Sequence, residues 1–299
     1  MGTPRFAVPT LERIVDAGHE VAAVFTQPDR PKGRGQSDAM PPVKDAALRL
    51  GLQVHQPERV RRPEVVEQLR DLNPDAMVVV GYGQIIPPAI LEIPPRGIIN
   101  VHASLLPKYR GAAPIQWAIA GGETRSGVTT MKIDAGLDTG DILLKWETEI
   151  GPEETAVELG DRLAVAGADL LVRTLAELAN IVPVKQDEQQ ASYAPILKRE
   201  DGRIDWSRSA GEIVNRIRAF VPWPGCYGSL RGHRFHIWKA KAVDGSLQPG
   251  RLQAVGKKLF AGCKQGALEL LEVQLEGKKR MTATAFLNGF ALDGSEDLA

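Results

Sequence analysis

Cysteine is scarce in this chain, with 2 residues among 299. Cys226 and Cys263 form no CxxC pair, and neither has a second Cys or a His at a familiar metal-ligand spacing. The sequence therefore predicts neither a disulfide framework nor a metal site. We expect two buried or idle thiols.

Long hydrophobic runs are also missing. No apolar run approaches the roughly 18 residues of a membrane helix, and the first residues lack the basic and apolar regions of a secretory signal. With 43% apolar and 25% charged residues, the composition is that of a globular protein long enough for two domains. We expect a cytoplasmic monomer that does not bind a membrane.

The chain has no net charge, yet its charges are unevenly distributed. Residues 202–299 contain 15 Lys and Arg against 9 Asp and Glu, which gives this part +6 and leaves −6 on the rest. A basic half is a hint of nucleic-acid binding, although this excess is modest. Charge alone leaves that function open.

Three common catalytic signatures are absent. Ser104 lies outside a GxSxG elbow, which disfavours a serine hydrolase. His233 and His236 have no HExxH motif or paired Cys beside them, so we interpret both as surface strand residues. Gly81-Tyr82-Gly83 lacks the third Gly and the helix opening of a dinucleotide fingerprint, and indicates a tight turn that lines a pocket.

Helix-like and strand-like segments alternate through the first 180 residues. Apolar spacing predicts helices at 11–15, 42–50, 113–120 and 154–179, and strands at 19–26, 76–80, 97–101 and 127–133. This alternation predicts an α/β fold with a doubly wound, largely parallel sheet and helices on both faces.

The N-terminus departs from this pattern. Met1-Gly2-Thr3-Pro4 resembles the loop that follows a first strand, and a first strand is normally central in a doubly wound sheet. The first strand is therefore apparently truncated. We expect the natural protein to start upstream with roughly eight to ten mostly apolar residues, a usual strand length.

A polar segment separates two parts of the chain. Lys185–Gln190 has no apolar periodicity and predicts a linker, which we place at 181–201. The predicted domains are then 1–180 and 202–299.

The second part changes in character. Ser209 and Glu212 form a capping-box pattern that begins a helix, and Pro222–Gly225 ends it. Short strand-like runs at 234–243 and 267–274, separated by Gly turns, predict a small barrel.

Two short motifs suggest the chemistry. Asn100 and His102 end a predicted strand, where positions i and i+2 point to the same face, and Asp138 follows in Gly136–Gly140. These three side chains together suit acyl transfer. The amide donates hydrogen bonds, the imidazole donates or accepts, and the carboxylate orients the imidazole or takes a proton. A developing oxyanion would meet Asn100 and His102, whereas the group that moves the proton stays open.

A third motif is a cationic loop. Asp29–Gly35 contains Arg30, Lys32 and Arg34 together with two glycines. This composition suits a mobile loop that reaches phosphates, with a solvated surface loop as the alternative.

Together these residues resemble the 10-formyltetrahydrofolate-dependent formyltransferases over nearly the whole chain. The Asn100-x-His102 pair, Ser104–Pro107 and the Asp138 loop resemble the core shared by members that act on tRNA, glycinamide ribonucleotide and sugars. Ala103, where Gly is common, and the absent first strand depart from the family pattern.

Three further segments resemble the members that act on methionyl-tRNA. They are Thr26–Gly35, Gly111–Gln116, and Arg203–Trp206 with Ile217–Pro224.

The resemblance implies a Rossmann-like catalytic domain, followed by an OB-like β-barrel that helps to hold tRNA. It implies 10-formyltetrahydrofolate as formyl donor, initiator methionyl-tRNA as acceptor and partner, and no metal. Asn100, His102 and Asp138 would be catalytic. The folate would lie along Tyr82, Gly83, Ile85, Ser104, Leu105, Leu106 and Pro107. Arg30, Lys32 and Arg34 would contact tRNA, with Arg34 the best single contact.

Three alternatives remain. A formyltransferase acting on an amino sugar or small nucleotide is disfavoured by the basic second half and the Arg34 loop. An RNA-binding protein with an inactive formyltransferase-like domain is disfavoured because Asn100, His102 and Asp138 are all present. A nicotinamide oxidoreductase is disfavoured by the incomplete Gly fingerprint.

Overall fold

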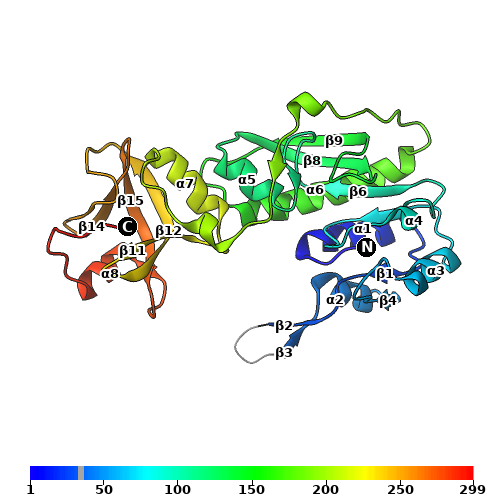
Figure 1. The fold of residues 1–299 in the computed structure, drawn as a ribbon, viewed down its shortest axis with the longest axis horizontal. Coiled ribbons are helices and arrows are strands. Elements are labelled where there is room, and N and C mark those ends of the chain that lie inside the picture. Colours follow the sequence, from blue (N-terminus) through cyan, green and yellow to red (C-terminus); the bar gives the residue numbers. More distant parts are fainter. Residues whose placement is uncertain (33–36, 299) are drawn as a thin grey trace. The chain divides into compact units, whose positions relative to one another are not determined.

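The chain folds into two compact units, each built from separate stretches of sequence (Figure 1). The structure, a computed structural model, describes residues 1–32 and 37–298. The first unit comprises Met1–Gly111, Ser126–Thr148 and Gly160–Ala194, and the second comprises Ala112–Arg125, Glu149–Leu159 and Pro195–Ala299.

A four-stranded sheet forms the centre of the first unit. Its strands, in spatial order, are β5 (Met77–Val79), β6 (Ile98–His102), β8 (Arg125–Lys132) and β9 (Ile142–Glu149). The pairing of β5 with β6 is parallel, as expected, but β8 runs antiparallel to β6. A parallel connection needs a crossover that packs back on the same sheet. The helix between β6 and β8, α5 (Pro114–Ala120), instead belongs to the second unit.

A second pair of strands lies beside this sheet. Strands β1 (Val24–Phe25) and β4 (Val54–His55) pair in parallel. Met1 and Gly2 provide backbone links toward the larger sheet: Gly2 N donates to Phe25 O, and Val80 N donates to Met1 O.

The helices of the first unit begin where the sequence places prolines. Proline fills an early position of α1, α2, α3 and α4, where its missing N–H costs no hydrogen bond. These helices and α6 are Val8–Asp16, Pro42–Arg49, Pro63–Asp71, Pro88–Leu91 and Ala156–Glu177.

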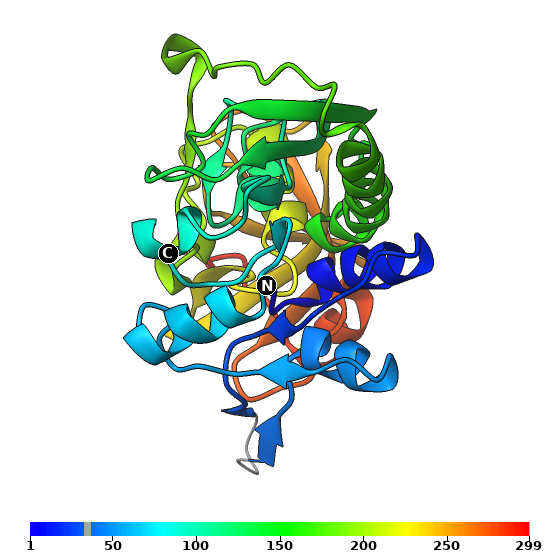
Figure 2. The same ribbon diagram turned by 90° about the vertical axis from the view of Figure 1, so that its right-hand side faces the viewer.

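The long helix α6 covers the larger sheet (Figures 1 and 2). A Cβ at Gly167 would lie 2.9 Å from Val101 Cγ1, so glycine lets this helix approach β6 closely. Thr130 on β8 and Thr174 on α6 share a buried hydrogen bond of 2.8 Å. The helix therefore closes one face of the strand that carries Asn100 and His102.

The second unit combines helices with an antiparallel sheet. Helix α7 (Ala210–Ala219) begins with the predicted capping box, in which Ser209 Oγ accepts from Glu212 N and Ser209 N donates to Glu212 Oε2. The sheet has the order β11-β12-β15-β14-β13, with β16 beside β15. These strands and α8 are β11 (Cys226–Leu230), β12 (His233–Val243), β13 (Leu252–Val255), β14 (Lys258–Gly262), β15 (Ala267–Leu275), β16 (Met281–Thr282) and α8 (Ala283–Gly289).

Among the described residues, the named strands of the second unit do not close into a barrel, although Leu298 bridges to Leu230 of β11 and Asp297 bridges to Arg251, just before β13. Over the described part of the chain, β11 and β13 end the path of paired strands and do not pair with each other. The small barrel expected from the Gly-punctuated strands is therefore not demonstrated by the pairing. In residues 1–32 and 37–298, no helix combines the length and apolar character needed to cross a membrane.

Candidate active site

Strand β6 holds two of the candidate catalytic side chains inside the first unit. Because β6 lies between β5 and β8 and is buried along its whole length, its polar side chains are also shielded from water. Asn100 is 8% exposed and His102 is 6% exposed. Buried polar groups of this kind need partners, which the neighbouring loops supply.

The third candidate, Asp138, lies in a tightly structured loop between β8 and β9. Asp134 Oδ1 accepts hydrogen bonds from Gly136 N at 3.0 Å and from Thr139 Oγ1 at 2.7 Å. A Cβ at Gly140 would lie 1.8 Å from Lys132 O, so this position requires glycine. These contacts involve the neighbours of Asp138 in the chain and not the Asp138 backbone itself.

The structure brings the three candidates together. Asn100 Nδ2 donates to Asp138 Oδ1 at 3.4 Å, and His102 Nδ1 lies 3.6 Å from Asp138 Oδ2. Asp138 Oδ2 also accepts from Gly111 N at 2.8 Å, so the carboxylate is held from a further segment. Its side chain is 16% exposed, which places an amide, an imidazole and a carboxylate in one largely dehydrated volume.

The hydrogen bonds of His102 determine which of its nitrogens can donate. His102 Nε2 lies 2.9 Å from Tyr109 O, and a carbonyl oxygen can only accept, so Nε2 carries a hydrogen. A neutral ring then has a bare Nδ1 facing Asp138. Nδ1 donates only when the ring is protonated, and accepts a proton when it is neutral. The sequence alone did not distinguish these two states.

The predicted folate segments differ strongly in exposure. Ser104 and Leu106 are 1% and 0% exposed, and Thr129 Oγ1 ties their backbone by donating to Ser104 O and accepting from Leu106 N. Tyr82 is 1% exposed, and burial raises its pKa to about 12, whereas Ile85 is 90% exposed. Only some of these side chains can therefore contact a ligand directly.

Sequence reasoning missed two residues, Gln186 and Glu188. The segment interpreted as a linker instead contacts Arg110, which is fully buried and directly precedes Gly111. Arg110 Nη1 and Nη2 donate to both carboxylate oxygens of Glu188, at 2.9 and 2.7 Å, and Arg110 Nε donates to Gln186 Oε1 at 3.0 Å. The hydrogen bonds with Glu188 raise the pKa of Arg110 and lower that of Glu188. No local sequence pattern predicts these contacts, because 76 residues separate Arg110 from Gln186.

The cationic loop is only partly described. Strands β2 (Arg30–Lys32) and β3 (Ser37–Ala39) form an antiparallel ribbon that begins with Arg30, and Lys44 Nζ donates to Asp29 Oδ2 at its base. Arg34 lies outside the described residues.

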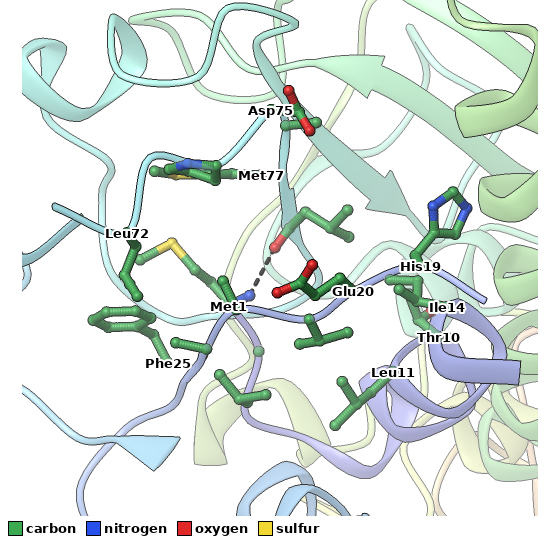
Figure 3. Close-up of a pocket in the computed structure, with 18 of the residues that line it drawn as sticks. Met1, Thr10, Leu11, Ile14, His19, Glu20, Phe25, Leu72, Asp75 and Met77 are labelled. Carbon is green, nitrogen blue, oxygen red and sulfur yellow. Dashed lines mark hydrogen bonds between the residues drawn. The ribbon is translucent and has the colours of Figure 1, made fainter. Parts of the chain in front are cut away.

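A cavity of ≈ 470 Å³ lies elsewhere in the first unit (Figure 3). It is lined mainly by apolar side chains such as Phe25, Leu72 and Met77, and the Met1 amino group donates to Val78 O at its edge. Its lining includes none of the three candidate catalytic residues. Within residues 1–32 and 37–298, no group of three or more His, Cys, Asp or Glu side chains could hold a metal ion.

The chain is similar to formyltransferases along its length. A family model described as formyl transferase matches residues 1–175, and a second, described as formyl transferase C-terminal domain, matches residues 196–291. The methionyl-tRNA formyltransferase of Solibacter usitatus (strain Ellin6076) is 63% identical, over 100% of this chain and 97% of its own length. That of Koribacter versatilis (strain Ellin345) is 58% identical, over 99% of this chain and 96% of its own length.

Solved structures agree with the fold. The N-formyltransferase of Helicobacter canadensis, solved with folinic acid and dTDP-3-aminofucose, has a TM-score of 0.66 at 20% identity and covers 90% of this chain and 96% of its own. WlaRD, a sugar 3N-formyl transferase, has a TM-score of 0.68 at 21% identity, over 93% and 97% of the two chains. At such identities these structures support the fold alone. Both family models and the full-length similarity to curated relatives show that the chain belongs to the formyltransferase family and, within it, to the methionyl-tRNA formyltransferases.

Proposed function

We propose that this enzyme transfers the formyl group of 10-formyltetrahydrofolate to the α-amino group of initiator methionyl-tRNA, for translation initiation. The convergence of Asn100, His102 and Asp138 carries the proposal, because it joins a preorganised donor to groups that can move a proton. The similarity to methionyl-tRNA formyltransferases indicates the acceptor.

The reaction balances as an acyl transfer. The neutral amine attacks the formyl carbon, a C–N bond forms, and the carbonyl oxygen becomes an oxyanion that accepts a hydrogen bond from Asn100 Nδ2. His102 Nδ1 also donates to the oxyanion when it carries a hydrogen, with Asp138 Oδ2 at 3.6 Å beside the ring. The amine then loses a proton, and N10 gains one directly, through Asp138 or through water. The oxyanion re-forms the carbonyl as the C–N10 bond breaks, which releases tetrahydrofolate and leaves the formyl group on the amine.

The folate lies along the loops that follow β5 and β6. The turn at Tyr82, Gly83 and Ile85 and the Ser104–Pro107 segment line its path. Because Ser104, Leu106 and Tyr82 are buried, backbone groups supply much of the recognition there, while the exposed Ile85 covers the ligand with apolar surface.

The remaining parts of the chain hold the tRNA. Residues 1–180 contain the Rossmann-like catalytic domain, and 202–299 form an OB-like barrel domain that binds tRNA. The segment 181–201, predicted as a linker, packs with the first unit up to Ala194. The ranges of the two family models support this division. The enzyme acts as a cytoplasmic monomer without a metal.

A row of aromatic rings on strands β11 and β12 of the second unit, with arginines over them, supports RNA binding. The His236 ring stacks on Trp238 at 5.1 Å and lies 5.6 Å from Tyr227. Arg234 and Arg280 lie over the outer rings, at 4.6 Å from Tyr227 and 5.4 Å from Trp238. Guanidinium groups attract phosphates and aromatic rings stack on bases, so this strand surface suits a nucleic acid.

Arg34, together with Arg30 and Lys32, contacts the phosphates of the acceptor end. Replacing Arg34 by Ala should raise KM for methionyl-tRNA and leave KM for the folate unchanged. Losing one phosphate contact lowers the slope of log affinity against log salt by about 1. Kinetics over a series of KCl concentrations measure this slope. The exposed Arg61, changed to Ala, provides the matched control, and equal effects of the two variants would rule out a specific role for Arg34.

The acceptor itself is tested by supplying 10-formyltetrahydrofolate with one of three amines. These are charged initiator methionyl-tRNA, a nucleotide-linked amino sugar and a small amino-bearing nucleotide. We expect formylation of the methionyl-tRNA, measured as N-formylmethionine after deacylation. Formylation of the small acceptors alone would replace the proposed function by that of the sugar-directed members.

A further inference from the structure

We propose that Gln186 is a positioning residue that holds the catalytic loop in its working conformation. This inference rests on the proposed role of Asp138. Gln186 Nε2 donates to Asp138 O and to Gly140 O, each at 2.8 Å. One amide nitrogen carries two hydrogens, so a single side chain serves both carbonyls at once.

The loop needs such support because Asp138 has a strained backbone. Its φ of +53° lies in the left-handed region, which residues other than glycine adopt at a cost. Residues 134–137 are exposed, so packing does little to hold this side of the loop. The two hydrogen bonds from Gln186 stabilise the backbone at Asp138 and two residues later, and thereby direct the carboxylate toward Asn100 and His102.

The orientation of the Gln186 amide is fixed by Arg110. A guanidinium only donates, so the atom that faces Arg110 Nε must be the amide oxygen, and the nitrogen then faces the two carbonyls. Glu188 holds the same guanidinium with both carboxylate oxygens. Gly111, next to Arg110, donates to Asp138 Oδ2. The buried Arg110 therefore connects the two groups that hold Asp138. Its neighbour Gly111 holds the Asp138 side chain, and its partner Gln186 holds the Asp138 backbone.

Gln186→Glu tests this role with little change in size. The variant keeps a carboxylate oxygen that accepts from Arg110 Nε. Its second oxygen replaces the amide nitrogen and cannot donate to the carbonyls of Asp138 and Gly140. We expect kcat to fall about 10- to 100-fold, since two hydrogen bonds are lost, with KM for both substrates within about 2-fold. Gln186→Met removes the two donors and also the oxygen that accepts from Arg110 Nε, without adding charge, and should likewise lower kcat with little change in KM. Thermal unfolding of both variants verifies that they fold.

The decisive measurement is the effect of Gln186→Glu in an Asp138→Asn background. If Gln186 acts through Asp138, the double variant is no slower than Asp138→Asn alone. Gln189→Glu adds the same charge at an exposed position of the neighbouring turn and should retain wild-type kcat.

Three results would overturn the inference. The first is an unchanged kcat in both Gln186 variants. The second is an equal loss of kcat on Gln186→Glu in the wild-type and in the Asp138→Asn backgrounds. The third is a rise in KM that accounts for the whole loss of kcat/KM. Inactivity of the wild-type enzyme toward methionyl-tRNA would instead contradict the proposed function, and the wild-type reaction measures this separately.

Discussion

Replacing Asn100 by Ala is expected to lower kcat by about 10²- to 10³-fold, the usual loss when one preorganised oxyanion donor is removed. Asn100 Nδ2 is a buried donor on a strand that is hydrogen-bonded on both sides, so it needs no reorganisation as charge develops. The folate contacts proposed here lie in other segments. The dissociation constant of the folate should therefore stay close to that of the wild-type enzyme.

Single-turnover rates and equilibrium folate binding measure the two quantities separately. Asn180→Ala, at an exposed position after α6, is the matched control for the amide and should keep its turnover. Near-wild-type turnover in Asn100→Ala would show that the oxyanion is stabilised elsewhere. A parallel loss of folate affinity would show that Asn100 binds the ground state instead.

Replacing Asp138 by Asn should have an effect of similar or greater size, about 10²- to 10⁴-fold in kcat, the range for a group that assists proton transfer. The variant has nearly the same shape. It loses the negative charge that faces His102 Nδ1 at 3.6 Å, and it keeps one oxygen that can accept from Gly111 N. The carboxylate can then no longer assist the proton transfer, and the ring of His102 loses the charged neighbour that orients it.

The pH dependence of kcat distinguishes this explanation from a loss of structure. A change in the profile of Asp138→Asn, with an unchanged melting temperature, supports a role of the carboxylate in the proton transfer. Asp71→Asn, at the exposed end of α3, is the charge-matched control. A wild-type rate in Asp138→Asn would remove the carboxylate from the mechanism.

Many local elements could be predicted from sequence because local interactions determine them. The helices expected at 42–50, 113–120 and 154–179 correspond to α2, α5 and α6 within about two residues, the usual uncertainty of helix ends. The Ser209 capping box is a contact between residues three positions apart, and the structure shows it.

The direction of β8 was not predictable in this way. The alternation of helix and strand predicted a largely parallel sheet, yet the pairing of β6 with β8 is antiparallel. Strand direction depends on where the connecting helix packs, and α5 packs in the other unit. The open path of the second sheet is likewise a matter of pairing between distant strands, which Gly-punctuated runs do not specify.

The sequence by itself determined the residue types and their local placement: Asn100 and His102 two positions apart on one strand, and Asp138 in a loop rich in glycine. Residue chemistry and strand periodicity are local properties, so they can be read without coordinates. Only the tertiary structure decided that His102 Nε2 donates to Tyr109 O, and that a supposed linker supplies Gln186 to the backbone of Asp138. Those contacts join partly buried groups that are not neighbours in the chain, and they satisfy polar atoms that folding has largely removed from water.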